Sequence, residues 1–180
     1  MYFVKKWFWL FLFLSLTACG DNLLPSGEDK RPPVQAGTTG PAVGQKAPDF
    51  AVPDTNGSIV TLSSALASRK GVVLYFTMWC PACDSQMSHL LDNTVPLFTN
   101  VGFYAVDYVS ATVADARSAE VGSGFAGSAF TVLADTGHAL LQGFQAAMGT
   151  TVVIDSSGVI RMNEYYKDGS RLQAVLAGLP

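Results

Sequence analysis

Two cysteines, Cys80 and Cys83, are separated by only two residues and lie at the boundary between two sequence patterns. Before them is a short apolar run, residues 72–76, whose β-branched and aromatic side chains are typical of a strand buried on both faces. After them, Cys83, Met87 and Leu90 fall at i, i+4 and i+7, the spacing of one face of a helix. The cysteines therefore stand where a buried strand passes into an amphipathic helix.

This position gives the two sulfurs different chemistry. Pro81 fits the first helical position, because its missing N–H would have no helical partner there. Cys80 is then the cap residue at the positive end of the helix dipole, and such sites lower a cysteine pKa from about 8.5 to about 3.5–7.5. Cys83 lies one turn further on, close enough for a disulfide. The sequence predicts an exposed nucleophile, Cys80, and a more buried resolving thiol, Cys83.

Two other interpretations of the pair are half of a zinc site and a static disulfide. Zinc normally needs four ligands, and the sequence has no second pair of cysteines. A static disulfide that closes so short a loop would constrain the unfolded chain little. Redox or metal chemistry at this pair is therefore favoured.

The composition limits the remaining possibilities. The chain has 180 residues, of which 49% are hydrophobic and 14% charged, enough for one well-packed domain but not comfortably for two. Its formal net charge of -3 provides no basic surface for nucleic acid. We expect no nucleic-acid partner.

The N-terminus has the features of a secretory signal peptide, which we assign to residues 1–18. Lys5-Lys6 precedes an apolar run, residues 7–16, that is too short to span a bilayer comfortably. Leu16-Thr17-Ala18-Cys19 resembles a bacterial lipobox, and the resemblance implies that Cys19 is acylated and becomes the first mature residue. The alternative is an ordinary cleaved signal with an incidental cysteine. By analogy with lipoprotein sorting, Gly20 rather than Asp after the cysteine favours the periplasmic face of the outer membrane.

Residues 19–44 are predicted to be a flexible tether, since they are rich in Pro and Gly and contain almost no large apolar side chain. The folded domain is expected to occupy residues 45–180. A flexible tether of this length would hold that domain on average about 25–30 Å from the membrane.

Within the domain, strand, turn and helix patterns alternate. Asn56-Gly57 is a strong hairpin signal, Thr112-x-x-Asp115 resembles a capping box, and Gly178 follows the last helical pattern. A second buried strand after the cysteine helix completes a βαβ unit, which is expected to be right-handed. The predicted elements, in order, are strands 50–52 and 58–62, a short helix capped by Ser63 or Ser64 and ending at Ala67, strand 72–76, a helix ending before Pro96, strand 103–109, helix 112–121, strand 130–133, helix 138–147, strands 151–154 and 159–166, and helix 170–177.

With these elements in place, the chain resembles thioredoxin-fold proteins of the TlpA/ResA type, within the redoxin group. Trp79-Cys80-Pro81-Ala82-Cys83 is the most specific part, and the likeness extends over four segments, residues 43–66, 72–83, 130–137 and 150–160. It implies an α/β thioredoxin-like fold, in which helices flank a central mixed sheet and an N-terminal β-hairpin is added.

The resemblance also implies a function, a membrane-tethered thiol–disulfide oxidoreductase outside the cytoplasm that contributes to redox homeostasis. Its partners would be protein thiols or disulfides and an upstream redox protein, with the membrane reached through the N-terminal lipid. No cofactor is expected. Besides the two cysteines, the residues implied to surround the active site are Trp79, Pro81, Ala82, Met148, Gly149 and Thr150.

Three positions depart from the family pattern. Relatives have a cis-proline directly before the closing hairpin, where this chain has Gly149. Thioredoxin has a buried Asp six residues before the first cysteine, which is Leu74 here, and many TlpA-type proteins have a Glu three residues after the second, which is Gln86 here. A carboxylate beside the resolving thiol can accept its proton, whereas an amide or isobutyl group cannot.

A peroxiredoxin-like peroxidase is the alternative enzyme. Thr77-x-x-Cys80 matches half of that family's PxxxTxxC motif, but Val73 occupies the proline position. The family's activating arginine would align with Gly149 and is absent. Without a cation to polarise the peroxide, rapid peroxidase chemistry is difficult.

A soft-metal binding and delivery module is the non-enzymatic alternative. Its candidate ligands are Met78, Cys80, Cys83 and Met148, whose sulfurs would select Cu(I). The competing interpretation is that methionines here fill the core, as they usually do. Outside this alternative, no metal is expected.

Overall fold

The computed structural model describes residues 33–180. The predicted signal peptide, Cys19 and the first part of the predicted tether lie outside these residues. Within residues 33–180 no helix combines the length and the apolar character needed to cross a membrane.

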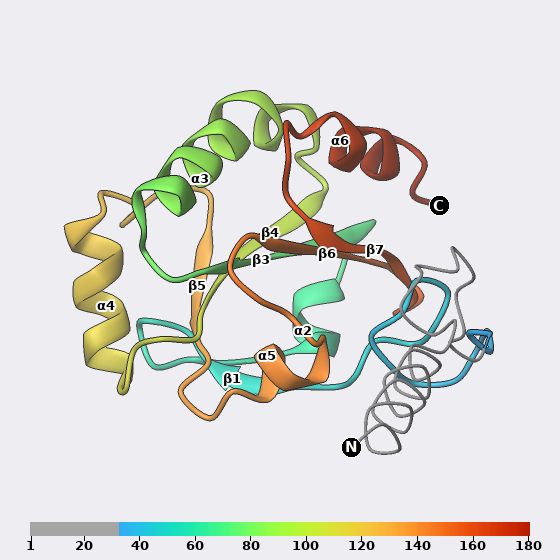
Figure 1. Cartoon of the computed structure of the whole chain (residues 1–180), viewed down its shortest axis with the longest axis horizontal. Coiled ribbons are helices and arrows are strands. Elements are labelled where there is room, and N and C mark those ends of the chain that lie inside the picture. The colour runs from blue at the N-terminus through green and yellow to red at the C-terminus, as the bar shows by residue number, and fades with distance from the viewer. Residues whose placement is uncertain (1–32) are drawn as a thin grey trace, which may run out of the picture. The chain divides into compact units, whose positions relative to one another are not determined.

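A five-stranded mixed sheet forms the centre of the domain, with strand order β5-β4-β3-β6-β7 (Figure 1). Strands β3, β4 and β5 run parallel, whereas β6 pairs antiparallel with both β3 and β7. A separate two-stranded hairpin, β1–β2, precedes the sheet. The strands are β1 (Ala51–Pro53), β2 (Ile59–Thr61), β3 (Gly71–Thr77), β4 (Val101–Asp107), β5 (Thr131–Ala134), β6 (Thr150–Asp155) and β7 (Ile160–Tyr165).

Helices cover both faces of the sheet (Figure 1). Helices α3 and α6 lie on one face, whereas α2, α5 and the β1–β2 hairpin lie on the other, and α4 lies beside the β5 edge. The predicted α/β architecture with a mixed sheet and an N-terminal hairpin is confirmed. The helices are α2 (Leu62–Leu66), α3 (Pro81–Asn93), α4 (Val113–Gly122), α5 (Ala139–Gly143) and α6 (Ser170–Ala177), with a short 3-10 turn, η2 (Val95–Leu97).

Strand β3 is buried along its whole length and divides the core into two layers. Leu74 and Phe76 point into the layer that contains Leu140 of α5, whereas Val73 and Tyr75 point into the layer that contains Met87 of α3. This division follows from the two-residue period of a strand. Tyr75 therefore faces the helix that carries the cysteines, and Leu74 faces away from it.

Some predicted boundaries were wrong. The predicted helix 138–147 is only Ala139–Gly143, because His138 (φ 57°) and Gln145 (φ 50°) both adopt left-handed backbone conformations. The cap of α2 is Thr61 rather than Ser63 or Ser64. Its hydroxyl accepts the Ser64 N–H at 3.1 Å while the Ser64 hydroxyl accepts the Thr61 N–H at 2.9 Å.

The last residues of the predicted tether are hydrogen-bonded to the domain. The Gly44 N–H donates to the Ile160 carbonyl at 2.9 Å, and the Ile160 N–H donates to the Gln45 carbonyl at 2.9 Å. Lys46 donates its N–H to the Thr38 carbonyl at 2.8 Å. The folded unit therefore begins before residue 45, the predicted start of the domain.

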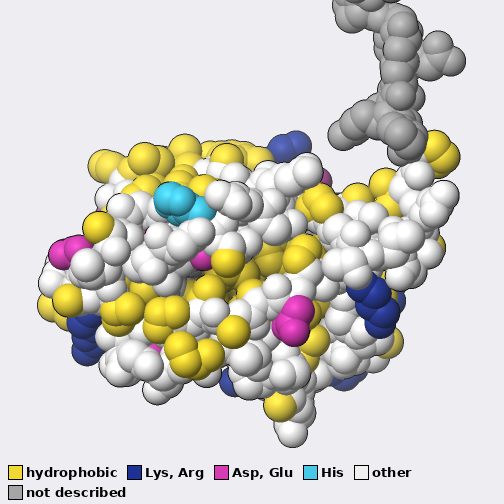
Figure 2. Space-filling view, turned by 90° about the horizontal axis from the view of Figure 1, so that it is seen from below, with side chains coloured by type: hydrophobic (Ala, Val, Ile, Leu, Met, Phe, Trp, Pro, Cys, Tyr) yellow, Lys and Arg dark blue, Asp and Glu magenta, His cyan; other side chains and the backbone are white. Residues whose placement is uncertain are grey.

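The face that carries β1 and α5 presents a band of hydrophobic side chains with few acidic groups (Figure 2).

Candidate active site

Strand β3 and helix α3 position the two cysteines. Cys80 is the N-cap of α3 with an extended backbone (φ -96°, ψ 159°), and Pro81 follows as the first helical residue. The Cys83 N–H donates to the Cys80 sulfur at 3.2 Å. Cys80 is partly exposed, whereas Cys83 is completely buried. The predicted cap position and the predicted difference in exposure between the two sulfurs are confirmed.

Hydrogen-bonding groups surround the inner sulfur. Burial raises the pKa of the Cys83 thiol, but hydrogen bonds with the Cys80 side chain, with the backbone of Met78 and Cys80, and with the Thr77 hydroxyl together lower it by more. The pKa of Cys83 is therefore below its ordinary value. The donors lie at the end of β3 and the start of α3, and they converge on the Cys83 sulfur.

Trp79 is held in an unusual conformation beside the pair. Its backbone is left-handed (φ 56°), and its N–H donates to the Thr77 hydroxyl at 3.1 Å. Its indole Nε1 donates to Asp107 Oδ2 at 2.8 Å. A residue whose backbone is held in a sparsely populated conformation, with its side chain also hydrogen-bonded, is typical of functional sites.

Asp107 was not predicted as a site residue. It is the last residue of β4, fully buried, and its Oδ1 accepts the N–H groups of Val109 and Ser110, each at 3.0 Å. The Ser110 hydroxyl donates to Oδ2 at 2.6 Å. Because β4 runs parallel to β3, the carboxylate lies at the same end of the sheet as the cysteines, where both strands end. The only signal in the sequence was a carboxylate near the end of a buried apolar strand.

The loop before β6 contains Gly149. The Thr150 N–H donates to the Ala147 carbonyl at 3.0 Å, which closes a four-residue turn. Gly149, with φ 76°, occupies the third position, where a type II turn requires a positive φ and favours glycine. The peptide bonds of residues 33–180 are all trans, including the one between Met148 and Gly149.

A hydrogen-bonded chain of three side chains lies between this loop and α3. The buried hydroxyl of Tyr75 donates to Gln86 Oε1 at 2.6 Å, and Gln86 Nε2 donates to the Tyr165 hydroxyl at 3.0 Å. Burial raises the pKa of Tyr75 far above its ordinary value, so this hydroxyl remains a donor. Gln86 thus uses its amide oxygen and one amide N–H, and neither of the tyrosines that it joins was predicted as a site residue.

Three exposed apolar side chains lie at the end of the sheet that carries the cysteines. Met78 follows β3, Val109 follows β4 and Tyr165 ends β7, with exposed fractions of 43%, 49% and 48% respectively. The register places Tyr165 two strands from β3, since Tyr165 pairs with Thr150 and the neighbouring Thr151 pairs with Tyr75. The end of the sheet that carries Cys80 therefore also carries exposed apolar side chains.

The degree of burial of two methionines near the cysteines bears on the metal alternative. Met87 is completely buried in the core, which supports its interpretation as core filler, whereas Met78 is exposed. Residues 33–180 contain no cluster of three or more His, Cys, Asp or Glu side chains that could hold a metal ion. A sulfur-only site at Met78, Cys80, Cys83 and Met148 stays a prediction.

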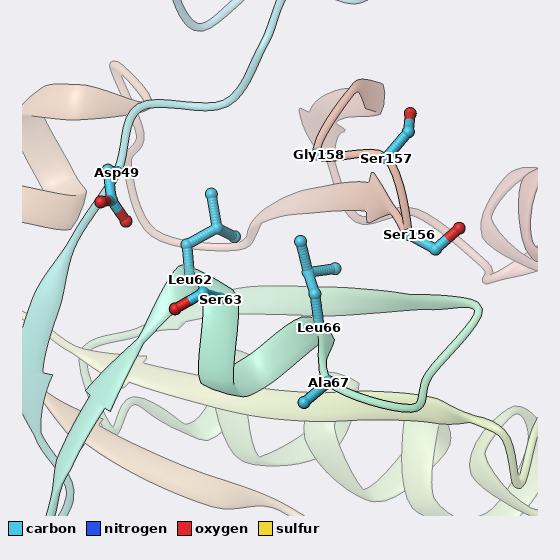
Figure 3. A pocket seen from close by; sticks show the side chains of 8 residues that line it. All are labelled: Asp49, Leu62, Ser63, Leu66, Ala67, Ser156, Ser157 and Gly158. Carbon is cyan, nitrogen blue, oxygen red and sulfur yellow. The ribbon is translucent and has the colours of Figure 1, made fainter.

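A hollow of about 520 Å³ lies at the other end of the sheet. Leu62 and Leu66 of α2 point toward the turn that carries Ser156 and Ser157 (Figure 3). This turn follows the end of β6 that pairs with the start of β3, and the hollow contains no sulfur. It is separate from the candidate active site.

The fold and the paired thiols at a helix N-terminus together define a thioredoxin-like redox protein. Residues 42–176 match the Redoxin family, and the chain belongs to this family. No curated protein is similar enough in sequence to be matched.

Several solved structures share the fold. A candidate thiol:disulfide interchange protein DsbE from Chlorobium tepidum is 25% identical over 77% of this chain and 99% of its own, with a TM-score of 0.64. A candidate protein disulfide isomerase from Bacteroides thetaiotaomicron is 22% identical over 77% of this chain and 89% of its own, with a TM-score of 0.64. Peroxidoxin BcpB from Mycobacterium tuberculosis is 21% identical over 76% of this chain and 95% of its own, with a TM-score of 0.59. The family match and the likeness to the DsbE structure support a redox enzyme, whereas the two structures below 25% identity show the shared fold alone.

Proposed function

We propose that this protein is a thiol–disulfide oxidoreductase that uses Cys80 and Cys83 as its redox pair. The observation that carries the proposal is the asymmetry of the two sulfurs, since Cys80 is partly exposed at the cap of α3 and Cys83 is buried behind it. An exposed sulfur can attack a partner protein, and a buried sulfur within reach of it can then release the partner from the mixed disulfide.

In the reduced protein, the Cys80 thiolate attacks one sulfur of a partner disulfide. The partner's S–S bond breaks, its second sulfur leaves as a thiolate that takes up a proton, and a mixed disulfide joins Cys80 to the partner. The Cys83 thiol then loses its proton and attacks the Cys80 sulfur, which releases the partner as its second thiolate, protonated by solvent. Two electrons and two protons have passed to the partner. The reverse sequence oxidises a partner dithiol.

A peroxidase is the second candidate, because a peroxidoxin is among the similar structures and Thr77 lies three residues before Cys80. Fast peroxide reduction is helped by a cation that polarises the peroxide. Within residues 33–180 the arginines are engaged elsewhere: Arg69 with the Val101 carbonyl, Arg117 with Glu120, Arg161 with Asp155 and Arg171 with Glu164. We therefore rank thiol–disulfide exchange above peroxidase activity.

We further propose that Cys19 carries the lipid that holds the domain at the periplasmic face of the outer membrane, after removal of residues 1–18. The support is the lipobox-like segment ending at Cys19 and the Pro- and Gly-rich stretch after it. The partners would then be envelope proteins with exchangeable thiols and an upstream redox protein. Membrane fractionation of Cys19→Ser cells, with the protein appearing in the soluble periplasmic fraction, tests this part.

The catalytic proposal is tested with two single substitutions. Cys80→Ser should lose all disulfide exchange, because no exposed sulfur of the pair remains. Cys83→Ser should accumulate mixed disulfides that can be isolated from cells and identified by mass spectrometry. The Cys80–Cys83 couple should have a reduction potential between about -270 and -120 mV, the span of known exchangers. Disulfide exchange by Cys80→Ser at the wild-type rate, or a pair inert to every reductant, would contradict the proposal. Tight Cu(I) binding by the reduced protein, weakened in Met148→Leu, would instead favour metal delivery.

A further inference from the structure

Tyr165 occupies the space that Gly149 leaves beside the redox pair. A Cβ built on Gly149 would lie 2.5 Å from Tyr165 Cε2 and 3.2 Å from Gln86 Oε1. Real side chains do not approach so closely, so the absence of a side chain at residue 149 is what admits the tyrosine ring. The ring therefore forms the wall of the site where the loop before β6 presents no side chain of its own.

The loop is fixed in this arrangement by backbone hydrogen bonds. The Gly149 N–H donates to the Phe76 carbonyl at 2.9 Å, and the Gly149 carbonyl accepts the Tyr166 N–H at 2.8 Å. Gly149 thus joins the end of β3, four residues before Cys80, to the residue that follows Tyr165. These two bonds fix the backbone next to the ring.

The ring is also fixed at its outer end. Its hydroxyl accepts the hydrogen bond from Gln86 on α3, and Gln86 is itself fixed by the buried Tyr75. Nevertheless, 48% of Tyr165 remains exposed. An aromatic side chain that is already ordered and half open loses little further conformational entropy when a partner packs on it.

We propose that Tyr165 is a specificity-determining residue, whose exposed ring contacts an apolar or aromatic side chain next to the reacting cysteine of a polypeptide substrate. This inference rests on the proposed exchange function. Two other exposed side chains at this end of the sheet, Met78 and Val109, are also apolar, which supports the proposal. Thioether and aromatic groups pack favourably on aromatic rings. A polypeptide with a polar or charged flank would gain nothing from this surface.

The test uses two synthetic peptides with the same disulfide, one with Phe and one with Ser beside the reacting cysteine. For each, kcat/KM of reduction is measured with the full-length protein. The wild-type protein should prefer the Phe peptide, and Tyr165→Ala should reduce this preference about tenfold, the effect expected of a buried aromatic contact. Val121→Ala, which removes an exposed apolar side chain from α4, is the matched control and should keep the preference.

Two further variants separate the ring from its hydroxyl. Tyr165→Phe retains the ring and loses the hydrogen bond to Gln86, and Gln86→Leu frees the hydroxyl without altering the ring. Both should keep most of the preference, because both retain the ring. Equal reduction of both peptides by the wild-type protein, or an unchanged preference in folded Tyr165→Ala, would overturn the inference alone. Should Tyr165→Ala fail to fold, as judged by its melting curve, complete loss of the preference in Tyr165→Phe would overturn it, because the ring is still present. Failure of the wild-type protein to reduce either peptide would overturn the proposed function and the inference with it.

Discussion

The two ends of the sheet satisfy their buried carboxylates in different ways. At the end away from the cysteines, Asp155 accepts hydrogen bonds from Ser157, Val159 and Arg161, all within six residues. At the cysteine end, Asp107 also accepts local hydrogen bonds from Val109 and Ser110, but it accepts a further one from Trp79, which is 28 residues away. The first arrangement is a turn that the local sequence builds by itself. The second joins two strands, so it forms only when the sheet has formed, and it places the tryptophan beside the redox pair.

The largest effect on stability is expected for Asp155→Ala. The substitution removes a fully buried carboxylate that accepts several hydrogen bonds, each worth about 0.5–1.5 kcal/mol net and more from a charged donor, so we expect a loss of about 3 kcal/mol in the free energy of unfolding. Disulfide exchange per folded molecule should be unchanged, because the turn lies at the far end of the sheet. Urea unfolding and a peptide-reduction assay measure the two quantities. A change in exchange rate would show that the two ends are coupled and would break the comparison.

Gly149→Ala should destabilise the cysteine end by about 2 kcal/mol. The positive φ disfavours any side chain, and the new Cβ would meet the Tyr165 ring at 2.5 Å. The double variant Gly149→Ala, Tyr165→Ala should recover the part of this loss that comes from the collision and not the part that comes from the backbone. A double-mutant cycle by urea unfolding measures the coupling. Strict additivity of the two single substitutions would contradict the packing of the ring on Gly149.

Asp107→Asn should cost about 1–2 kcal/mol and also slow exchange, because the amide retains one acceptor and the indole of Trp79 loses its charged partner. Here stability and activity are expected to change together, unlike in Asp155→Ala. Rates are measured on fully folded protein with a small disulfide. Asp107→Asn with a wild-type rate would limit the carboxylate to a structural role.

The smallest effect is a pH dependence at the far end. Burial raises the pKa of Asp155, but hydrogen bonds from Ser157 and Val159 and the charge of Arg161 together lower it below its ordinary value of about 3.8. A carboxyl with a depressed folded pKa adds stability above the unfolded pKa, and this stability is lost as pH falls through the folded pKa. The difference in melting temperature between the wild type and Asp155→Asn should therefore be largest near neutral pH and shrink below about pH 3.8. A constant difference down to pH 2 would show that the carboxylate is not stabilised in the folded state.

The same contrast explains what the sequence could and could not predict. Cys80 as the cap of α3 and Thr112 as the cap of α4 depend on neighbours within a few residues, and their residue types predicted them. Gln86 was predicted as an amide that cannot take up a proton. Its actual role, joining Tyr75 to a tyrosine 79 residues later, depends on the register between helix and sheet. No short-range pattern encodes that register.

The helix predicted from His138 to Ala147 shows a different kind of error, because here the local pattern predicted more regular structure than the chain forms. Its apolar spacing continues to Ala147, but the chain leaves the helix after Gly143. Asn163 donates to the Phe144 carbonyl at 2.9 Å, so a contact from β7 takes the place of a further helical turn. Tertiary contacts decided this boundary against the local pattern.

The sealed position of Cys83 has a practical consequence for covalent labelling. Iodoacetamide added to the native, reduced domain should modify Cys80 and leave Cys83 untouched until the protein is unfolded, so the two masses report folding as well as reactivity. A single adduct would end turnover, because the inner sulfur has no route to a substrate of its own.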